Sequence, residues 1–202
     1  MKNTNHSLFD KYEMIKDLGT GSSGSVILVR HISMDQERAL KKVPKASAFA
    51  ESALSEARLL KSLEHPSIPR IFDFEEDDAF YYIVEEYIDG ETLDSFLLHQ
   101  QLISPGLFFN ICEQLCNVFI YLHTQISTPI IYRDLKPEHI IVCHNKLKLI
   151  DFGVSAYVIQ DGNNFNHYGN IEFSAPECFT EDTITPAADI YSLGQLLQYI
   201  LT

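Results

Sequence analysis

The sequence has little that marks a secreted, metal-scaffold or membrane protein. Its 4 cysteines form no CxxC pair and no Cys/His metal spacing, so we expect reduced thiols. No apolar run is long enough to span a membrane, and the polar stretch from Met1 to Asp10 lacks the apolar core of a secretory signal. We therefore expect a cytoplasmic protein without a membrane partner.

Basic residues are also scarce. Lys and Arg number 15 against 28 Asp and Glu, which gives a formal net charge of -13. Because no basic excess exists to neutralise a phosphate backbone, we expect no nucleic-acid partner. A single nucleotide is not excluded, since it needs only a local positive site. The hydrophobic content of 46% and charged content of 21% are typical of a globular protein.

Hydrophobic patterning predicts two regions of different character. The first has expected strands at 12–18, 25–31, 38–43, 68–74 and 80–87, with one amphipathic helix at 49–63. The second has expected helices at 93–99, 105–125 and 187–201, and short strands at 130–131, 140–143 and 147–150. This order predicts an α+β protein with a β-rich N-lobe (about 12–85), a hinge (86–90) and a helical C-lobe (91–202). Residues 1–11 are expected to form an N-terminal extension.

A glycine-rich segment, Gly19-Thr20-Gly21-Ser22-Ser23-Gly24, follows the first expected strand. In a dinucleotide-binding fold such glycines open a helix. Here they lead into Val26-Ile27-Leu28-Val29, which is β-branched and typical of a strand. This favours a strand–loop–strand flap whose backbone can closely approach phosphate oxygens, with a plain hairpin turn as the alternative.

Two adjacent lysines, Lys41 and Lys42, stand in the third expected strand. Side chains alternate across a strand, so Ala39 and Lys41 share a face. A small residue beside an adenine and a cation at its phosphates belong together, which favours Lys41 as the functional lysine. Lys42 fits a solvated surface lysine better.

The C-terminal half carries Tyr132-Arg133-Asp134-Leu135-Lys136-Pro137-Glu138-His139, then Asp151-Phe152-Gly153 and Ala175-Pro176-Glu177. A carboxylate, an ammonium group and candidate metal ligands thus occur within a short span. That combination suits phosphoryl transfer, which depends mainly on positioning and charge neutralisation.

In order and spacing, these motifs resemble the protein kinase family, serine/threonine type and bacterial-like, over residues 12–202. The resemblance implies a two-lobed kinase-like fold, here lacking the last helices of its C-lobe. It also implies ATP and Mg²⁺ as cofactors, and a protein substrate that is phosphorylated on serine or threonine.

The resemblance further implies roles for particular residues. Asp134 would accept or orient the substrate hydroxyl proton, and Lys136 would stabilise the transferring phosphoryl group. Lys41 would pair with Glu56, with Glu51 as the competing glutamate. Asp151 and His139 would hold Mg²⁺. Besides Lys41, the ATP-binding residues would be Leu18, Gly19, Thr20, Gly21, Ser22, Ser23, Gly24, Val26, Ala39, Glu86, Ile88 and Ile141, and Glu85 would occupy the gatekeeper position.

Departures from the family pattern suggest an alternative. His139 replaces an asparagine that holds a second Mg²⁺, and imidazole is a softer ligand than Mg²⁺ prefers, so we expect weakened or one-metal catalysis. Residues 154–170 contain no threonine, which argues against control by a phosphothreonine. The alternative is a nucleotide-binding pseudokinase acting as a regulatory interaction module; a small-molecule phosphotransferase is a third class.

The apolar face of 186–201 has little chain left to cover it, which predicts self-association or a covering partner.

Overall fold

The computed structural model describes residues 8–21, 24–100, 102–125, 127–157, 170–180 and 184–202. Contacts divide the described chain into two compact units. Unit 1 contains the residues up to Glu64 together with Pro69–Tyr87, and unit 2 contains His65–Ile68 and Ile88–Thr202. The division at Tyr87 and Ile88 falls within the hinge expected from the sequence.

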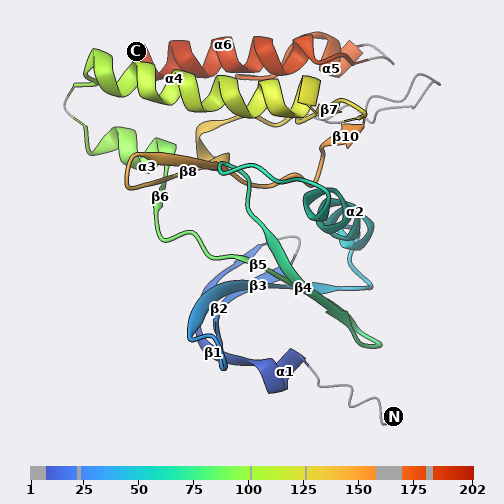
Figure 1. Cartoon of the computed structure of the whole chain (residues 1–202). Coiled ribbons are helices and arrows are strands. Elements are labelled where there is room, and N and C mark those ends of the chain that lie inside the picture. Colours follow the sequence, from blue (N-terminus) through green and yellow to red (C-terminus); the bar gives the residue numbers. More distant parts are fainter. Residues whose placement is uncertain (1–7, 22–23, 101, 126, 158–169, 181–183) are drawn as a thin grey trace. The chain divides into compact units, whose positions relative to one another are not determined.

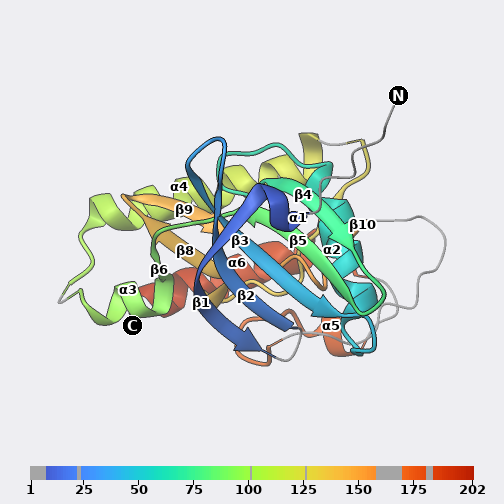
Figure 2. The same ribbon diagram turned by 90° about the horizontal axis from the view of Figure 1, so that it is seen from below.

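Unit 1 is built on a five-stranded antiparallel sheet in the order β1-β2-β3-β5-β4. Its strands are β1 (Tyr12–Gly21), β2 (Gly24–His31), β3 (Gln36–Pro44), β4 (Ile71–Glu76) and β5 (Phe80–Glu86). Figure 2 shows these strands lying beside one another. Two helices complete the unit, α1 (Leu8–Lys11) and α2 (Ala50–Lys61).

The central strand β3 separates two small cores because its side chains alternate between the faces of the sheet. Leu40 packs with Leu8 of α1 and with apolar residues of β2 and β5. Val43 faces the other way and packs against Ala53 and Ala57 of α2. The face that Val43 shares with Ala39 and Lys41 is therefore the face that α2 covers.

Unit 2 is mainly helical. Its helices are α3 (Leu93–Leu98), α4 (Pro105–Ile120), α5 (Glu177–Thr180) and α6 (Ala187–Leu201), with a π-helical turn, η1 (Tyr121–Gln125), and a 3-10 turn, η2 (Pro137–His139). Its short strands are β6 (Glu91–Thr92), β7 (Ile130–Ile131), β8 (Ile140–Cys143), β9 (Lys146–Leu149) and β10 (Ala156–Tyr157). Figure 1 shows α4 and α6 side by side, and the two helices are in contact.

Local sequence explains where the helix α4 begins. Ser104 is its N-cap, and the Ser104 hydroxyl accepts a hydrogen bond from the Leu107 N–H at 3.2 Å. Pro105 follows at the first helical position, where its missing N–H costs nothing. Among the described helices, none combines the length and apolar character needed to cross a membrane.

Most expected elements are present, and α6 has the bounds predicted for it, but two expectations were wrong. The strand expected at 68–74 begins only at Ile71. Residues 65–68 belong to unit 2, where the Ser67 carbonyl accepts a hydrogen bond from the Leu149 N–H at 2.8 Å. The helix expected to reach Gln125 ends as an α-helix at Ile120 and continues as the π-helical turn η1.

Five described elements were not expected: α1, β6, η2, β10 and α5. Each has no more than four residues, too few to show a hydrophobic period. In α1, for example, Leu8 is the only buried residue, and its packing on the sheet is a tertiary contact.

Candidate active site

The glycine-rich segment joins β1 to β2. Gly21 pairs with Gly24, and Gly19 pairs with Val26, so the glycines lead into a strand and not into a helix. Gly24 has φ of +144°, and a Cβ there would collide with the backbone carbonyl of Lys42. Glycine is thus required at this position by both conformation and space. Leu18, Gly19 and Thr20 are exposed, whereas Ser22 and Ser23 lie outside the described residues.

The two adjacent lysines of β3 point to opposite faces of the sheet. The Lys41 ammonium lies 2.6 Å from the Glu56 carboxylate, and the exposed fractions of the two side chains are only 17% and 7%. Glu51, the competing glutamate, is exposed at the start of α2. The Lys42 ammonium lies 4.0 Å from the centre of the Phe80 ring on the other face. The alternation therefore places Lys41 with Glu56, while Lys42 makes a cation–π contact.

The expected hinge spans the end of β5 and the start of unit 2. Glu85 is half-buried and stands opposite Ala39 of β3 in the register. Glu86 donates its N–H to the Arg70 carbonyl at 2.9 Å. Ile88 is half-buried as well, as is Ile141 of β8, which pairs with Thr92. The structure therefore describes these four residues, Glu85 and Glu86 in unit 1 and Ile88 and Ile141 in unit 2.

The loop between β7 and η2 carries Asp134 and Lys136. The Lys136 ammonium lies 3.1 Å from the Asp134 carboxylate, and both side chains are about one-fifth exposed, 23% and 20%. Arg133, just before them, has φ of +76°, a left-handed conformation that a non-glycine residue rarely adopts. Strain of this kind persists where surrounding contacts hold the backbone in place.

Asp189 provides those contacts. Its carboxylate is fully buried in the first turn of α6 and accepts hydrogen bonds from the N–H groups of Tyr132 and Arg133, each at 2.8 Å. The same carboxylate lies 2.8 Å from Nε2 of His123, which stands on the π-helical turn η1. Three donors therefore converge on one carboxylate, which fixes the backbone just before Asp134.

Tyr132 is a packing residue with an anchored hydroxyl. Its ring is completely buried and meets the Phe152 ring edge-on at 5.0 Å between centroids. Its hydroxyl donates a hydrogen bond to the Ile150 carbonyl. Tyr132 thus ties the loop to the chain that leads into Asp151.

His139 lies between the two aspartates of the site. Its Nδ1 is 3.0 Å from the Asp134 carbonyl oxygen and 3.4 Å from the Asp134 carboxylate. Its Nε2 is 3.4 Å from Oδ2 of Asp151. Asp151 has φ of +60°, and its side chain is 53% exposed. The structure therefore brings together three of the residues predicted for catalysis and metal binding.

Only the two ends of the segment at 154–170 are described. Ser155 donates its hydroxyl to the Tyr132 carbonyl at 3.1 Å, whereas Tyr168 lies outside the described residues. Ala175, from the Ala-Pro-Glu motif, is buried with Ile131 of β7 and Cys178 of α5. Burial raises the pKa of the Cys178 thiol, which lowers its reactivity.

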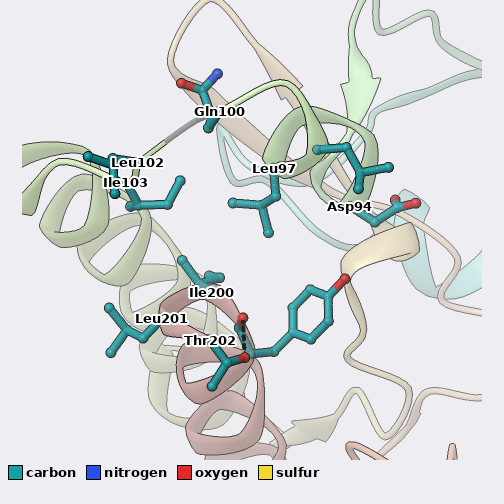
Figure 3. Close-up of a pocket in the computed structure, with 10 residues that line it drawn as sticks. Asp94, Leu97, Gln100, Leu102, Ile103, Ile200, Leu201 and Thr202 are labelled. Carbon is teal, nitrogen blue, oxygen red and sulfur yellow. Dashed lines mark hydrogen bonds between the residues drawn. The ribbon is translucent and has the colours of Figure 1, made fainter.

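A separate groove in unit 2 lies between α3 and the end of α6 (Figure 3). It has a volume of about 460 Å³, and Leu97, Ile103 and Ile200 line it. Leu98 and Leu201, which also line it, are 84% and 66% exposed. It contains none of the residues predicted for ATP, metal or catalysis.

Self-association, or a partner that covers the apolar face of α6, stays a prediction. We expect the chain to gain apparent mass with concentration in light scattering, because exposed apolar side chains favour association. A monomer over the whole range, without binding of a dye specific for exposed hydrophobic surface, contradicts it.

Residues 12–202 match the protein kinase domain, and the chain belongs to that family. This confirms the resemblance and the α+β kinase-like fold expected from the sequence.

Known relatives carry related names. Serine/threonine-protein kinase PrkC of Bacillus subtilis is 31% identical over 201 residues, 95% of this chain and 30% of the relative. Serine/threonine-protein kinase ppk25 of Schizosaccharomyces pombe is 33% identical over 188 residues, 90% of this chain and 44% of the relative. Serine/threonine-protein kinase PknB of Mycolicibacterium smegmatis is 30% identical over 212 residues, 98% of this chain and 33% of the relative. The chain thus spans less than half the length of these relatives.

Sequence reasoning missed two contacts of the site. His123 supports Asp189 from 66 positions away, and no local pattern marks it. The hydroxyl of Tyr132 bonds to Ile150, which only the folded loop brings near. The sequence shows the residue types but not their hydrogen-bond partners.

Proposed function

We propose that this chain transfers the γ-phosphoryl group of ATP to serine or threonine hydroxyls of proteins. The observation that carries this proposal is the loop with Asp134 and Lys136, whose charged groups lie 3.1 Å apart and whose backbone is held by the buried Asp189. Asp134 would orient the substrate hydroxyl and accept its proton. Lys136 would neutralise charge that develops on the phosphoryl group.

Each unit contains residues that are predicted to bind the nucleotide. In unit 1, the backbone of the glycine-rich segment and Lys41 would bind the phosphates, with Glu56 holding the lysine extended. Ala39, Val26 and Leu18 would contact the adenine, and backbone groups of Glu86 and Ile88 would hydrogen-bond to it. In unit 2, Ile141 would contact the base.

A divalent ion fits the donors that Asp151 and His139 present. Asp151 is exposed enough to share an ion with phosphate oxygens. Nε2 of His139 lies 3.4 Å from Oδ2 of Asp151. Such an ion would neutralise the charge of the phosphates. Asp151 and His139 themselves would hold the ion in place against the loop of Asp134.

A nucleotide-binding pseudokinase is the second candidate function, because His139 stands where the family pattern has asparagine. A small change in ion position would be enough to slow the transfer, since positioning provides most of the catalysis. The protein substrate, and a cytoplasmic location, stay predictions.

The proposal is tested by incubating the chain with γ-³²P-labelled ATP and a general protein substrate such as histone. We expect labelled phosphoserine or phosphothreonine after acid hydrolysis, and a rise in melting temperature when ATP is added. Stabilisation by ATP without any transfer would support the pseudokinase instead. The absence of both phosphoryl transfer and stabilisation by ATP would exclude both functions.

Lys41→Met is expected to lower the transfer rate about 100-fold or more, because it removes a cation directed at the phosphates. The neighbouring change Lys42→Met is the matched control. It removes the same charge from the opposite face of the strand, where Lys42 contacts Phe80. We expect Lys42→Met to transfer at nearly the normal rate. Equal losses in the two variants would show that Lys41 has no special role.

A further inference from the structure

His139 is oriented by hydrogen-bond acceptors that surround one side of its ring. Nδ1 lies 3.0 Å from the Asp134 carbonyl oxygen, which can only accept a hydrogen bond. The Tyr132 hydroxyl lies 3.5 Å from the same nitrogen and already donates its proton to Ile150. Nδ1 therefore carries a proton, and in the neutral form of the ring, which is the form that binds a metal, Nε2 carries the lone pair.

That lone pair faces another acceptor. Nε2 lies 3.4 Å from Oδ2 of Asp151, while Oδ1 of Asp151 lies 3.4 Å from the N–H of Gly153. A neutral imidazole nitrogen and a carboxylate oxygen do not attract each other directly. A cation bound to both atoms removes the conflict. Neighbouring ligands on an ion with bonds of about 2.1 Å stand roughly 3.0–3.4 Å apart, so the observed separation suits chelation.

The contact on the far side of the ring also fits a metal ligand. A histidine that binds a metal through one nitrogen typically donates its other N–H to a carbonyl or carboxylate, which fixes the ring and raises its basicity. Nδ1 of His139 has this arrangement with Asp134. The side chain is only 12% exposed, so its ring is held by its surroundings.

The donor set decides which ion is preferred. Mg²⁺ favours oxygen ligands throughout, whereas imidazole nitrogen increases affinity for first-row transition metal ions. Among the residues that the structure describes, no group of three or more His, Cys, Asp or Glu side chains could hold a metal ion. The remaining ligands would be water and phosphate oxygens, which such ions also accept.

We propose that Nε2 of His139 and Oδ2 of Asp151 chelate a divalent transition metal ion of the Mn²⁺ type in preference to Mg²⁺. The inference deepens the proposed function and rests on it for the phosphate ligands. Where the asparagine of the family pattern offers an oxygen, this chain offers a nitrogen. His139 is then a substitution that changes the metal and does not simply weaken the site.

The test is a measurement of metal ligation that needs no phosphoryl transfer. The chain is labelled uniformly with ¹⁵N and mixed with MnCl₂, alone and with unlabelled ATP. Pulsed electron paramagnetic resonance then detects nitrogen bound to Mn²⁺. Signals from ¹⁵N come from the protein, and those from ¹⁴N come from adenine. We expect a ¹⁵N coupling typical of imidazole in the wild type.

Two variants identify the nitrogen. His139→Asn should lose the ¹⁵N coupling, and its preference for Mn²⁺ over Mg²⁺ in competition should fall about tenfold or more. His144→Asn is the matched control, because His144 is exposed in the β8–β9 turn and has φ of +47°, a conformation that asparagine tolerates. It should keep both properties.

The outcomes separate this inference from the proposed function. A ¹⁵N coupling without phosphoryl transfer supports the metal site and argues against the kinase activity. Transfer, or bound Mn²⁺ and ATP, without any ¹⁵N coupling overturns the metal site and leaves the proposed function standing. The absence of bound Mn²⁺ under both conditions also overturns the metal site. The wild-type spectrum decides this even if His139→Asn does not fold.

Discussion

Asp134→Asn is expected to lower the rate of phosphoryl transfer by about 10²–10⁴-fold, while the binding of ATP stays nearly unchanged. The asparagine keeps the shape of the side chain but removes the carboxylate that would accept the proton of the substrate hydroxyl. It also removes the negative partner of Lys136, which lies 3.1 Å away. Steady-state transfer of ³²P and thermal stabilisation by ATP measure the two effects separately.

The matched control for this variant is Asp35→Asn. Asp35 is an exposed residue in the β2–β3 turn, outside the predicted site, with φ of +48°, where asparagine is well tolerated. It makes the same change in charge, so it corrects for the general effect of one lost carboxylate. A transfer rate in Asp134→Asn equal to that of Asp35→Asn would remove Asp134 from the mechanism.

Local rules predicted the parts of the site that depend on one element. The opposite directions of Lys41 and Lys42 follow from alternation along a strand, which any extended segment obeys. The flap form of the glycine-rich segment followed from the β-branched residues after it. Glu56 is buried and Glu51 exposed in α2, so burial separates two glutamates that residue type alone could not.

Features that depend on distant segments could not be predicted in the same way. The strand expected to start at the apolar Ile68 begins only at Ile71, because residues 65–68 belong to unit 2, where Ser67 contacts Leu149. The direction of the His139 ring depends on the Asp134 carbonyl and on Tyr132. From the sequence alone, histidine in place of asparagine indicates weakened catalysis, because the sequence does not show the direction of Nε2.

Asp189 illustrates how contacts between distant segments determine stability. Here the resemblance to the protein kinase family does predict the contact, because it implies that the aspartate at the start of this helix braces the catalytic loop. Its carboxylate is fully buried and accepts hydrogen bonds from the N–H groups of Tyr132 and Arg133 and from Nε2 of His123. Replacing it with alanine leaves three donors without this acceptor: the N–H groups of Tyr132 and Arg133, and Nε2 of His123, whose side chain is 10% exposed. Buried donors that lose their acceptor keep the full cost of their lost hydration.

We expect Asp189→Ala to lower the free energy of unfolding by about 3–5 kcal/mol, because each buried donor left without an acceptor costs about 1–3 kcal/mol. For a chain of this size, that loss lowers the melting temperature by roughly 10 °C. The matched control Asp78→Ala removes an exposed carboxylate from the β4–β5 turn and should change stability by no more than about 0.5 kcal/mol. Chemical denaturation followed by circular dichroism measures both. A melting temperature of Asp189→Ala close to that of Asp78→Ala would mean that the loop before Asp134 is held by other contacts, and its left-handed Arg133 would then need another explanation.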